Sequence, residues 1–377
     1  MAASCFTLGV EEEFQMVNKH TGQLASRVHT VLEKGTPVLG DQIKEEFLQS
    51  MLEVITDVCP NIAALRTELY RLRAKTAELV DTEDLALISA GTHPSAYYWE
   101  QVRSQGTRYE QLEQEYQDVA RIMIVCGLHV HVGLEDYEMA IPLMNQLRTW
   151  LPHLLAISAN SPFWLGRNSG LKSYRTIVAK GLARSGVPDV FNSTGHFHEY
   201  INSLIKAGCI DNGKRIWWDI RPHPFFYTLE FRVCDMPATI EDELAIAALC
   251  QALVAKLTWM YKRNVVTCTL PRHFIEENKW RAMRYGLDAE CIDFVQNRRM
   301  SMRDAIAELL DFVDDVLDDL NNRREINYLR ALLEDPRGTG ADRQLAVYEQ
   351  SSSLQTVAHF LMQQTLEGVT PSIVRWY

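Results

Sequence analysis

The stretch FTLGVEEEFQMV, residues 6–17, predicts a β-strand with one charged face and one mainly apolar face. Side chains alternate between the two faces of a strand, so Glu11 and Glu13 point to one face, whereas Val10, Glu12 and Phe14 point to the other. An isolated Glu-x-Glu pair is most often part of a solvated sheet face. Here a solvated face is a less complete explanation, because two later stretches also place charged or ionisable side chains on one face of a predicted strand.

Two further strands are predicted to be apolar on one side and charged on the other. In VCGLHVHVGL, residues 125–134, His129 and His131 share a face. In FFYTLEFRVCD, residues 225–235, the alternation predicts a shared polar face made of Thr228, Glu230, Arg232 and Cys234. Three such strands predict one antiparallel sheet whose charged face lines a polar cavity.

The residue types on this face indicate a metal and nucleotide site. Carboxylates and neutral imidazole bind divalent ions, and oxygen ligands dominate for Mg²⁺ and Mn²⁺. Arg232 lies two residues from Glu230 on the predicted face, and a guanidinium binds phosphoryl oxygens bidentately. The pattern therefore favours a cavity that binds a metal-nucleotide complex.

Glu46 and Glu53 form another acidic pair, seven residues apart. In a helix this spacing places the two side chains on nearly the same face, whereas in one continuous strand it places them on opposite faces. From the residues alone, charges on a solvated helix are the commoner outcome. Their role depends on local geometry.

The rest of the chain predicts an α+β protein. A strand is expected at 85–92, and helices are expected at 61–81, 108–124, 140–160, 240–262, 301–334 and 341–366. Strands concentrate in one part and helices in another, which differs from a βαβ alternation. Without repeats or a long linker, residues 1–377 are expected to form one catalytic domain, with a strand-rich core at about 5–235 and a helical part at about 240–377.

Composition excludes several classes of partner. The chain has 38 basic and 49 acidic side chains, a formal net charge of −11. An acid excess without a basic block argues against nucleic acid and against anionic membranes. No uninterrupted apolar run of about 18 residues or signal-peptide pattern is visible, so a cytoplasmic protein is expected.

Two other motifs are weaker. GCIDNGKR, residues 208–215, approaches a P-loop pattern, but Arg215 stands where a metal-binding hydroxyl is required. His196, His198 and Glu199 could form a second metal site, but no zinc-ligand spacing accompanies them. We therefore interpret the first motif as unrelated to a P-loop and the histidines as surface residues.

Seven stretches along the chain resemble the glutamate-cysteine ligase type 2 family of YbdK-like carboxylate-amine ligases, in the glutamine synthetase-like superfamily. They are LGVEEEF (8–14), SMLEVITDVC (50–59), GTHP (91–94), GLHVHVGL (127–134), SANSPFWLGRNSGLKSYR (158–175), WDIRPHPFFYTLEFRVCD (218–235) and GTGADRQL (338–345). Because they occur in order over most of the chain, the resemblance is more specific than any single motif.

The resemblance implies a curved antiparallel sheet that holds ATP and divalent metals on its concave face, with helices packed behind. By position, the implied metal ligands are Glu11, Glu13, Glu46, Glu53, His129 and Glu230. Arg232 resembles the phosphate-binding arginine and is, with Glu230, the implied catalytic residue. Further nucleotide or substrate contacts are expected at His131, Arg167, Ser173, Arg175, Arg221 and Arg343.

The reaction implied is amide formation that depends on ATP and Mg²⁺, with Mn²⁺ as a substitute, through an acyl phosphate. Glutamate and cysteine are the family's nominal substrates. A second hypothesis keeps the chemistry and changes the acceptor to another amino acid, ammonia or a small amine. A third is a nucleotide-binding protein without turnover. The family also suggests a homo-oligomer, a dimer or larger.

Overall fold

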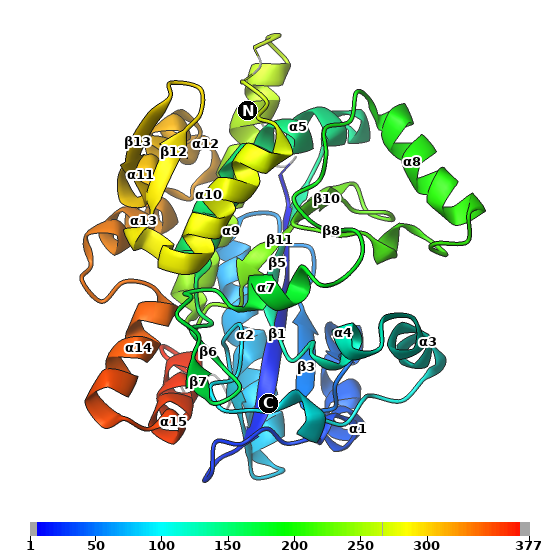
Figure 1. The fold of residues 1–377 in the computed structure, drawn as a ribbon, viewed down its shortest axis with the longest axis vertical. Coiled ribbons are helices and arrows are strands. Elements are labelled where there is room, and N and C mark those ends of the chain that lie inside the picture. Colours follow the sequence, from blue (N-terminus) through cyan, green and yellow to red (C-terminus); the bar gives the residue numbers. More distant parts are fainter. Residues whose placement is uncertain (1–5, 266, 370–377) are drawn as a thin grey trace.

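The computed structural model describes residues 6–265 and 267–369, and an antiparallel sheet of seven strands lies at its centre (Figure 1). The strand order is β10-β11-β5-β1-β3-β2, and β4 also pairs with β1. The strands are β1 (Leu8–Asn18), β2 (Ile43–Glu45), β3 (Met51–Ile55), β4 (Leu85–Ile88), β5 (Gly127–Gly133), β10 (Ile220–Pro222) and β11 (Thr228–Asp235). Both ends of the expected domain, residues 1–5 and 370–377, lie outside the described residues.

The strand register brings the predicted charged faces together. Glu11 on β1 lies opposite His129 on β5, and Glu13 lies opposite Glu53 on β3. On the next pair, His131 of β5 lies opposite Glu230 of β11. Directly opposed residues of an antiparallel pair project from the same face. The three strands expected from sequence therefore share one charged face.

The predicted alternation along β11 is wrong after Phe231. A register shift, typical of a β-bulge, separates Phe231 from Cys234, and Cys234 pairs with Leu128. Val233 lines the cavity beside Arg232, while the Cys234 thiol lies 3.9 Å from the carbonyl oxygen of Leu154. An extra residue in one strand exchanges the faces beyond it. Cys234 consequently belongs to the apolar side, not to the face of Glu230.

Residues 43–55 form a hairpin where the sequence favoured a solvated helix for Glu46 and Glu53. Strands β2 and β3 pair antiparallel, with Lys44 opposite Glu53. Glu46 follows the last residue of β2, and the chain then turns back into β3. The helix expectation is therefore wrong, because pairing with the sheet overrides a local pattern compatible with either structure.

Two long helices cover the apolar face of the sheet. Helix α2 (Ile62–Asp81) begins at Asn61, whose side chain accepts a hydrogen bond from the Ala64 backbone N–H. Helix α9 (Ile240–Tyr261) begins at Thr239, which caps it in the same way. Helix α9 is long and apolar enough to span a membrane, but 83% of its most apolar 18-residue stretch is buried inside the protein. It is packed as the central core helix.

The remaining helices surround this core (Figure 1). In Figure 1, α3 and α4 lie to one side of β1, and α14 and α15 lie to the other. The helices are α1 (Val28–Leu39), α3 (Thr107–Tyr116), α4 (Asp118–Arg121), α5 (Ala140–Leu147), α6 (Leu151–Ser158), α7 (Arg175–Ala179), α8 (Thr194–Lys206), α10 (Arg272–Tyr285), α11 (Met302–Phe312), α12 (Leu317–Leu320), α13 (Arg323–Glu334), α14 (Gly340–Ser351) and α15 (Leu354–Thr365).

The remaining strands of the described chain form three small pairs: β6 (Phe163–Trp164) with β7 (Arg167–Asn168), β8 (Ser185–Gly186) with β9 (Trp217–Trp218), and β12 (Glu290–Asp293) with β13 (Arg298–Ser301). The first two pairs belong to the segments that connect the strands of the main sheet. The third interrupts the C-terminal part, which was expected to be almost entirely helical.

Candidate active site

A cavity of about 790 Å³ lies over the charged face of the sheet. Its floor is formed by residues of β1, β3, β5 and β11, and its walls come from α3, α7, the segment 211–217 and one residue of α10. The exposed aromatic residues Phe225 and Phe226, between β10 and β11, also line it. The cavity is large enough for a small-molecule substrate or cofactor.

One end of the cavity concentrates carboxylates. Glu13, Glu46 and Glu53 each offer an oxygen within 4.8 Å of the other two, and Glu11, Glu53 and His129 form a second group of this kind. Among residues 6–265 and 267–369, no lysine or arginine nitrogen lies within 4.0 Å of a carboxylate oxygen of Glu13, Glu46 or Glu53. Like charges gathered in this way disfavour ionisation unless a cation joins them.

The electrostatics of these carboxylates shows the same deficit of positive charge. Burial, and then the charge of Glu46, raise the pKa of Glu13 from 4.5 to about 7. Burial and the charge of Glu46 also raise the pKa of Glu53 well above its usual range. A bound divalent cation would offset this repulsion and restore the ionised carboxylates.

His129 lies between two of the acidic side chains. Its Nδ1 is 2.8 Å from Glu11 Oε2, and its Nε2 is 3.7 Å from Glu13 Oε1. Burial, reinforced by the nearby charge of Arg232, lowers the pKa of His129 to about 4, so the ring is neutral near pH 7. Neutral imidazole is the form that coordinates metals.

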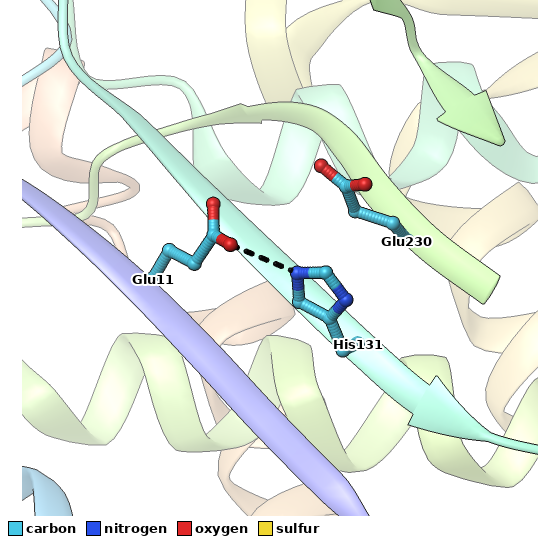
Figure 2. Close-up of side chains that lie close together, drawn as sticks. All are labelled: Glu11, His131 and Glu230. Atoms are coloured by element: carbon cyan, nitrogen blue, oxygen red, sulfur yellow. Dashed lines mark hydrogen bonds and ion pairs between the residues drawn. The ribbon is translucent and has the colours of Figure 1, made fainter. Parts of the chain in front are cut away.

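Glu11, His131 and Glu230 form a third group with ligand atoms within 4.8 Å of one another (Figure 2). His131 Nε2 is 3.2 Å from Glu11 Oε1, the contact drawn as a dashed line in Figure 2. Burial would raise the pKa of Glu11, but hydrogen bonds with His129 and His131 hold it well below its usual range. His131, expected at the nucleotide or substrate, is thus placed among the candidate metal ligands.

Glu230 is held between two arginines. Arg221 Nε donates to Glu230 Oε2 at 2.7 Å, Arg221 Nη2 donates to Oε1 at 3.1 Å, and Arg232 also pairs with Oε1. Burial would raise the pKa of Glu230, but the charges of Arg232 and Arg221 hold it well below its usual range. The carboxylate is therefore ionised and fixes both guanidinium groups at the cavity.

Arg175 reaches the cavity from the start of α7. Its Nη2 donates to the carbonyl oxygen of Arg232 at 3.2 Å, whereas its buried Nε has no partner within the described chain. Its guanidinium crosses Gly127, where any Cβ atom would collide with it. Glycine at 127 is thus required for this placement.

Three predicted contact residues lie away from the cavity lining. The Ser173 hydroxyl donates to the buried Asp235 at 2.8 Å, and Arg343 pairs with Asp242 at the first turn of α9. Arg167 is exposed on β7. The structure brings together the other predicted residues, Glu11, Glu13, Glu46, Glu53, His129, His131, Arg175, Arg221, Glu230 and Arg232.

Several lining residues were not predicted from the sequence. Asp219 and His223 line the cavity on either side of the predicted Arg221, and each is the cross-strand neighbour of a residue on β11. The period-two alternation in WDIRPH, residues 218–223, is a signal that could have found them. Lys279 carries no such signal, because it comes from the distant helix α10.

The structure places the two weaker motifs in a short turn and on an exposed face of a helix. In 208–215 only a short 3₁₀ turn, Gly213–Arg215, forms where a P-loop would begin a helix, although Lys214 and Arg215 do line the cavity. His196 and His198 are exposed on α8. None of the candidate metal groups in the described part of the chain includes them.

Comparison with known proteins places the chain in a family. Residues 7–360 match the family model described as glutamate-cysteine ligase family 2. The protein named "Putative glutamate--cysteine ligase 2" of Chloroflexus aurantiacus is 45% identical over 97% of this chain and 93% of its own length. A relative of the same name from Roseiflexus sp. (strain RS-1) is 46% identical over 97% of this chain and 96% of its own length.

A solved structure shares the fold. The glutamate-cysteine ligase of Francisella tularensis, crystallised in complex with AMP, aligns with a TM-score of 0.73 at 15% identity, covering 98% of this chain and 91% of that one. The expected α+β fold with its antiparallel sheet is confirmed.

Proposed function

The chain belongs to glutamate-cysteine ligase family 2 and is a ligase acting on small-molecule substrates, and we propose that it uses ATP and Mg²⁺ to join a carboxylate to an amine through an acyl phosphate. Glutamate and cysteine are the first substrate pair to test, because relatives about 45% identical bear the glutamate-cysteine ligase name. One observation carries the proposal. The cavity holds a cluster of carboxylates that lacks neutralising positive charge, and beside it lie two arginines that both pair with Glu230.

The donor set fits hard divalent cations. Carboxylate oxygens dominate all three groups, and none contains a thiolate. We assign Glu13, Glu46 and Glu53 as ligands of one divalent ion. Further divalent ions would be coordinated by Glu11, His129, His131 and Glu230. When bound, such ions would neutralise charge on the polyphosphate and orient it.

The chain's own residues then act on the transferring group. Arg232 and Arg221 are fixed by Glu230, so their remaining N–H groups are oriented before the substrate arrives. Arg175, with its unpartnered Nε, adds a third guanidinium at the same cavity. Preoriented cationic donors stabilise negative charge that develops on phosphoryl oxygens and cost little reorganisation. The carboxylate substrate attacks the γ-phosphorus of ATP, ADP leaves, and the amine later displaces phosphate from the acyl carbon.

The amine acceptor is the less defined half of the proposal. No residue pattern in the cavity identifies a thiol-bearing amine, so the second hypothesis, with another amino acid or amine, remains the main competitor. The family resemblance further predicts a homo-oligomer, which light scattering of the purified protein would measure.

ADP release by the purified protein, with ATP and Mg²⁺ and a panel of carboxylates and amines, tests the proposal. We expect release to require both a carboxylate and the divalent ion, and to be greatest with glutamate and cysteine. If another pair supports release and this pair does not, the acceptor assignment is wrong. If no pair does so while ATP still binds, the proposed chemistry is wrong.

A further inference from the structure

A buried ion pair outside the acidic groups forms part of the cavity wall. Lys279 on α10 is 1% exposed, and its Nζ donates to Asp219 Oδ2 at 2.5 Å. Both residues line the cavity. Within residues 6–265 and 267–369, neither side chain hydrogen-bonds to any other group. The ammonium therefore keeps further N–H donors, and Asp219 keeps a second oxygen, for a ligand.

The register of β10 and β11 fixes this pair beside the arginines. Arg221 lies opposite Glu230, and the Arg232 backbone N–H donates to the Asp219 carbonyl oxygen at 2.8 Å. Asp219 is thus the cross-strand neighbour of Arg232, and its side chain shares the cavity face with Arg221 two residues later. The Asp219 N–H in turn donates to the Gly186 carbonyl oxygen at 2.9 Å. The carboxylate is consequently held on ordered backbone.

The chemistry of the pair suits a zwitterion. Burying a lysine is costly, and a single ion pair seldom compensates fully for the lost solvation. An incoming carboxylate that joins Lys279, together with an ammonium that joins Asp219, would satisfy both groups without separating them. An α-amino acid carries these two charges on groups bonded to one carbon atom, whereas a simple dicarboxylate or a simple amine carries only one kind of charge.

We propose that Lys279 and Asp219 bind the α-carboxylate and the α-ammonium of the substrate whose second carboxylate is phosphorylated beside Arg232. This inference rests on the proposed ligase function, with glutamate as its carboxylate substrate, and assigns two residues of the cavity wall to the end of that substrate that carries both charges. Lys279 and Asp219 then determine specificity. They recognise the end of the substrate that does not react.

Calorimetric titration with glutamate and with glutarate, which lacks the amino group, tests the assignment in the presence of Mg²⁺ and a non-hydrolysable ATP analogue. Wild-type protein should bind glutamate more tightly than glutarate. Asp219→Asn should weaken glutamate binding about tenfold or more, the usual effect of losing one charge-assisted hydrogen bond, and should leave glutarate binding nearly unchanged. Lys279→Gln should weaken both ligands, because each has a carboxylate at that position.

The control variant is Glu277→Gln. Glu277 lies two residues before Lys279 on α10, pairs with Arg281 at 2.9 Å and, like Arg281, does not line the cavity. Its loss removes an ion pair of the same helix, so glutamate affinity should stay at the wild-type value. If Asp219→Asn and Lys279→Gln also keep that value, or if wild-type protein does not prefer glutamate to glutarate, the inference is wrong.

Turnover separates this inference from the proposed function. Wild-type ADP release that occurs equally with glutamate and glutarate would overturn the inference and leave the ligase function intact. Absence of release with every carboxylate would overturn the ligase function. In the variants, a raised KM for glutamate with an unchanged KM for ATP supports the assignment. A KM for ATP that rises in parallel with the KM for glutamate would contradict the assignment. Asp219→Glu, which keeps the carboxylate, should retain more glutamate affinity than Asp219→Asn.

Discussion

Strand β1 carries glutamates on both faces, and the glutamates on the two faces lie in different charge environments. On the closed face, Glu12 is fully buried and accepts hydrogen bonds from Arg73 at 3.1 and 2.5 Å, and Arg73 also pairs with the buried Glu243. On the open face, Glu11 and Glu13 line a cavity rich in carboxylates. Three consecutive residues of one type thus take part in two unlike charge clusters.

The difference lies in where the neutralising charge comes from. The closed cluster contains its own cation, Arg73, which also donates to the carbonyl oxygens of Ala238 and Thr365. Burial raises the pKa of Glu243 well above its usual range, whereas the charge of Arg73 acts to lower it. Among the described residues, no arginine or lysine pairs with Glu13, Glu46 or Glu53 of the open face as Arg73 pairs with Glu12. We infer that the closed cluster is structural, whereas the open one is built to receive a cation from solution.

The largest expected effect is the loss of turnover in Glu230→Gln. Without this carboxylate, Arg221 and Arg232 lose their shared anchor and no longer present oriented donors, so ADP release should fall at least about 10²–10³-fold. Circular dichroism should show that the variant remains folded. Glu12→Gln, on the closed face, is the matched control. It should lower stability and keep the wild-type kcat. Equal kcat values for Glu230→Gln and wild type would remove Glu230 from the site.

Arg73→Met should have the largest effect on stability. It leaves Glu12 and Glu243 buried without a cation, a change that typically costs about 3–5 kcal/mol of unfolding free energy. Urea denaturation measures this cost. Arg71→Met, on the same helix, should cost clearly less, because the Arg71 side chain is 40% exposed and its partner Glu68 retains contact with solvent. Similar midpoints for the two variants would mean that the closed cluster has no special structural role.

A smaller effect is expected from pH in the absence of divalent ions. The pKa of Glu13 is about 7 in the folded protein against an ordinary value of 4.5, so the folded state binds this proton more tightly. The resulting stabilisation is fully present below pH 4.5 and is lost as pH rises through about 7. Urea midpoints measured with EDTA should fall over this range more steeply in wild type than in Glu13→Gln. Saturating Mg²⁺ should reduce the difference above pH 7, and an identical pH dependence in both proteins would contradict the account.

Much of the open face could be predicted from local patterns. Period-two alternation in β1, β5 and β11 was enough to place Glu11, Glu13, His129 and Glu230 on one face, because side-chain direction in a strand depends only on residue parity. The same rule failed for Cys234, where a bulge changes parity, and a bulge leaves no clear mark in the sequence.

Other parts of the site depend on contacts between distant segments. Glu46 joins Glu13 and Glu53 only because residues 43–55 form a hairpin, and Lys279 reaches Asp219 only because α10 packs beside the sheet. The partner of Glu12 could not be predicted either, since Arg73 lies on α2, whose pattern shows only which of its faces is apolar. Family resemblance supplied Glu46 and Glu53, but it also suggested Ser173, Arg167 and Arg343, which lie outside the cavity lining.

Titration of Mn²⁺, followed by electron paramagnetic resonance, distinguishes the two faces of β1, because we propose that the open-face carboxylates bind divalent cations and the closed-face carboxylates do not. Wild type, Glu53→Gln and Glu12→Gln would be compared with and without a non-hydrolysable ATP analogue. We expect Glu53→Gln to lose at least one bound Mn²⁺, whereas Glu12→Gln should keep the wild-type number and affinity. Unchanged Mn²⁺ binding in Glu53→Gln would contradict this proposal.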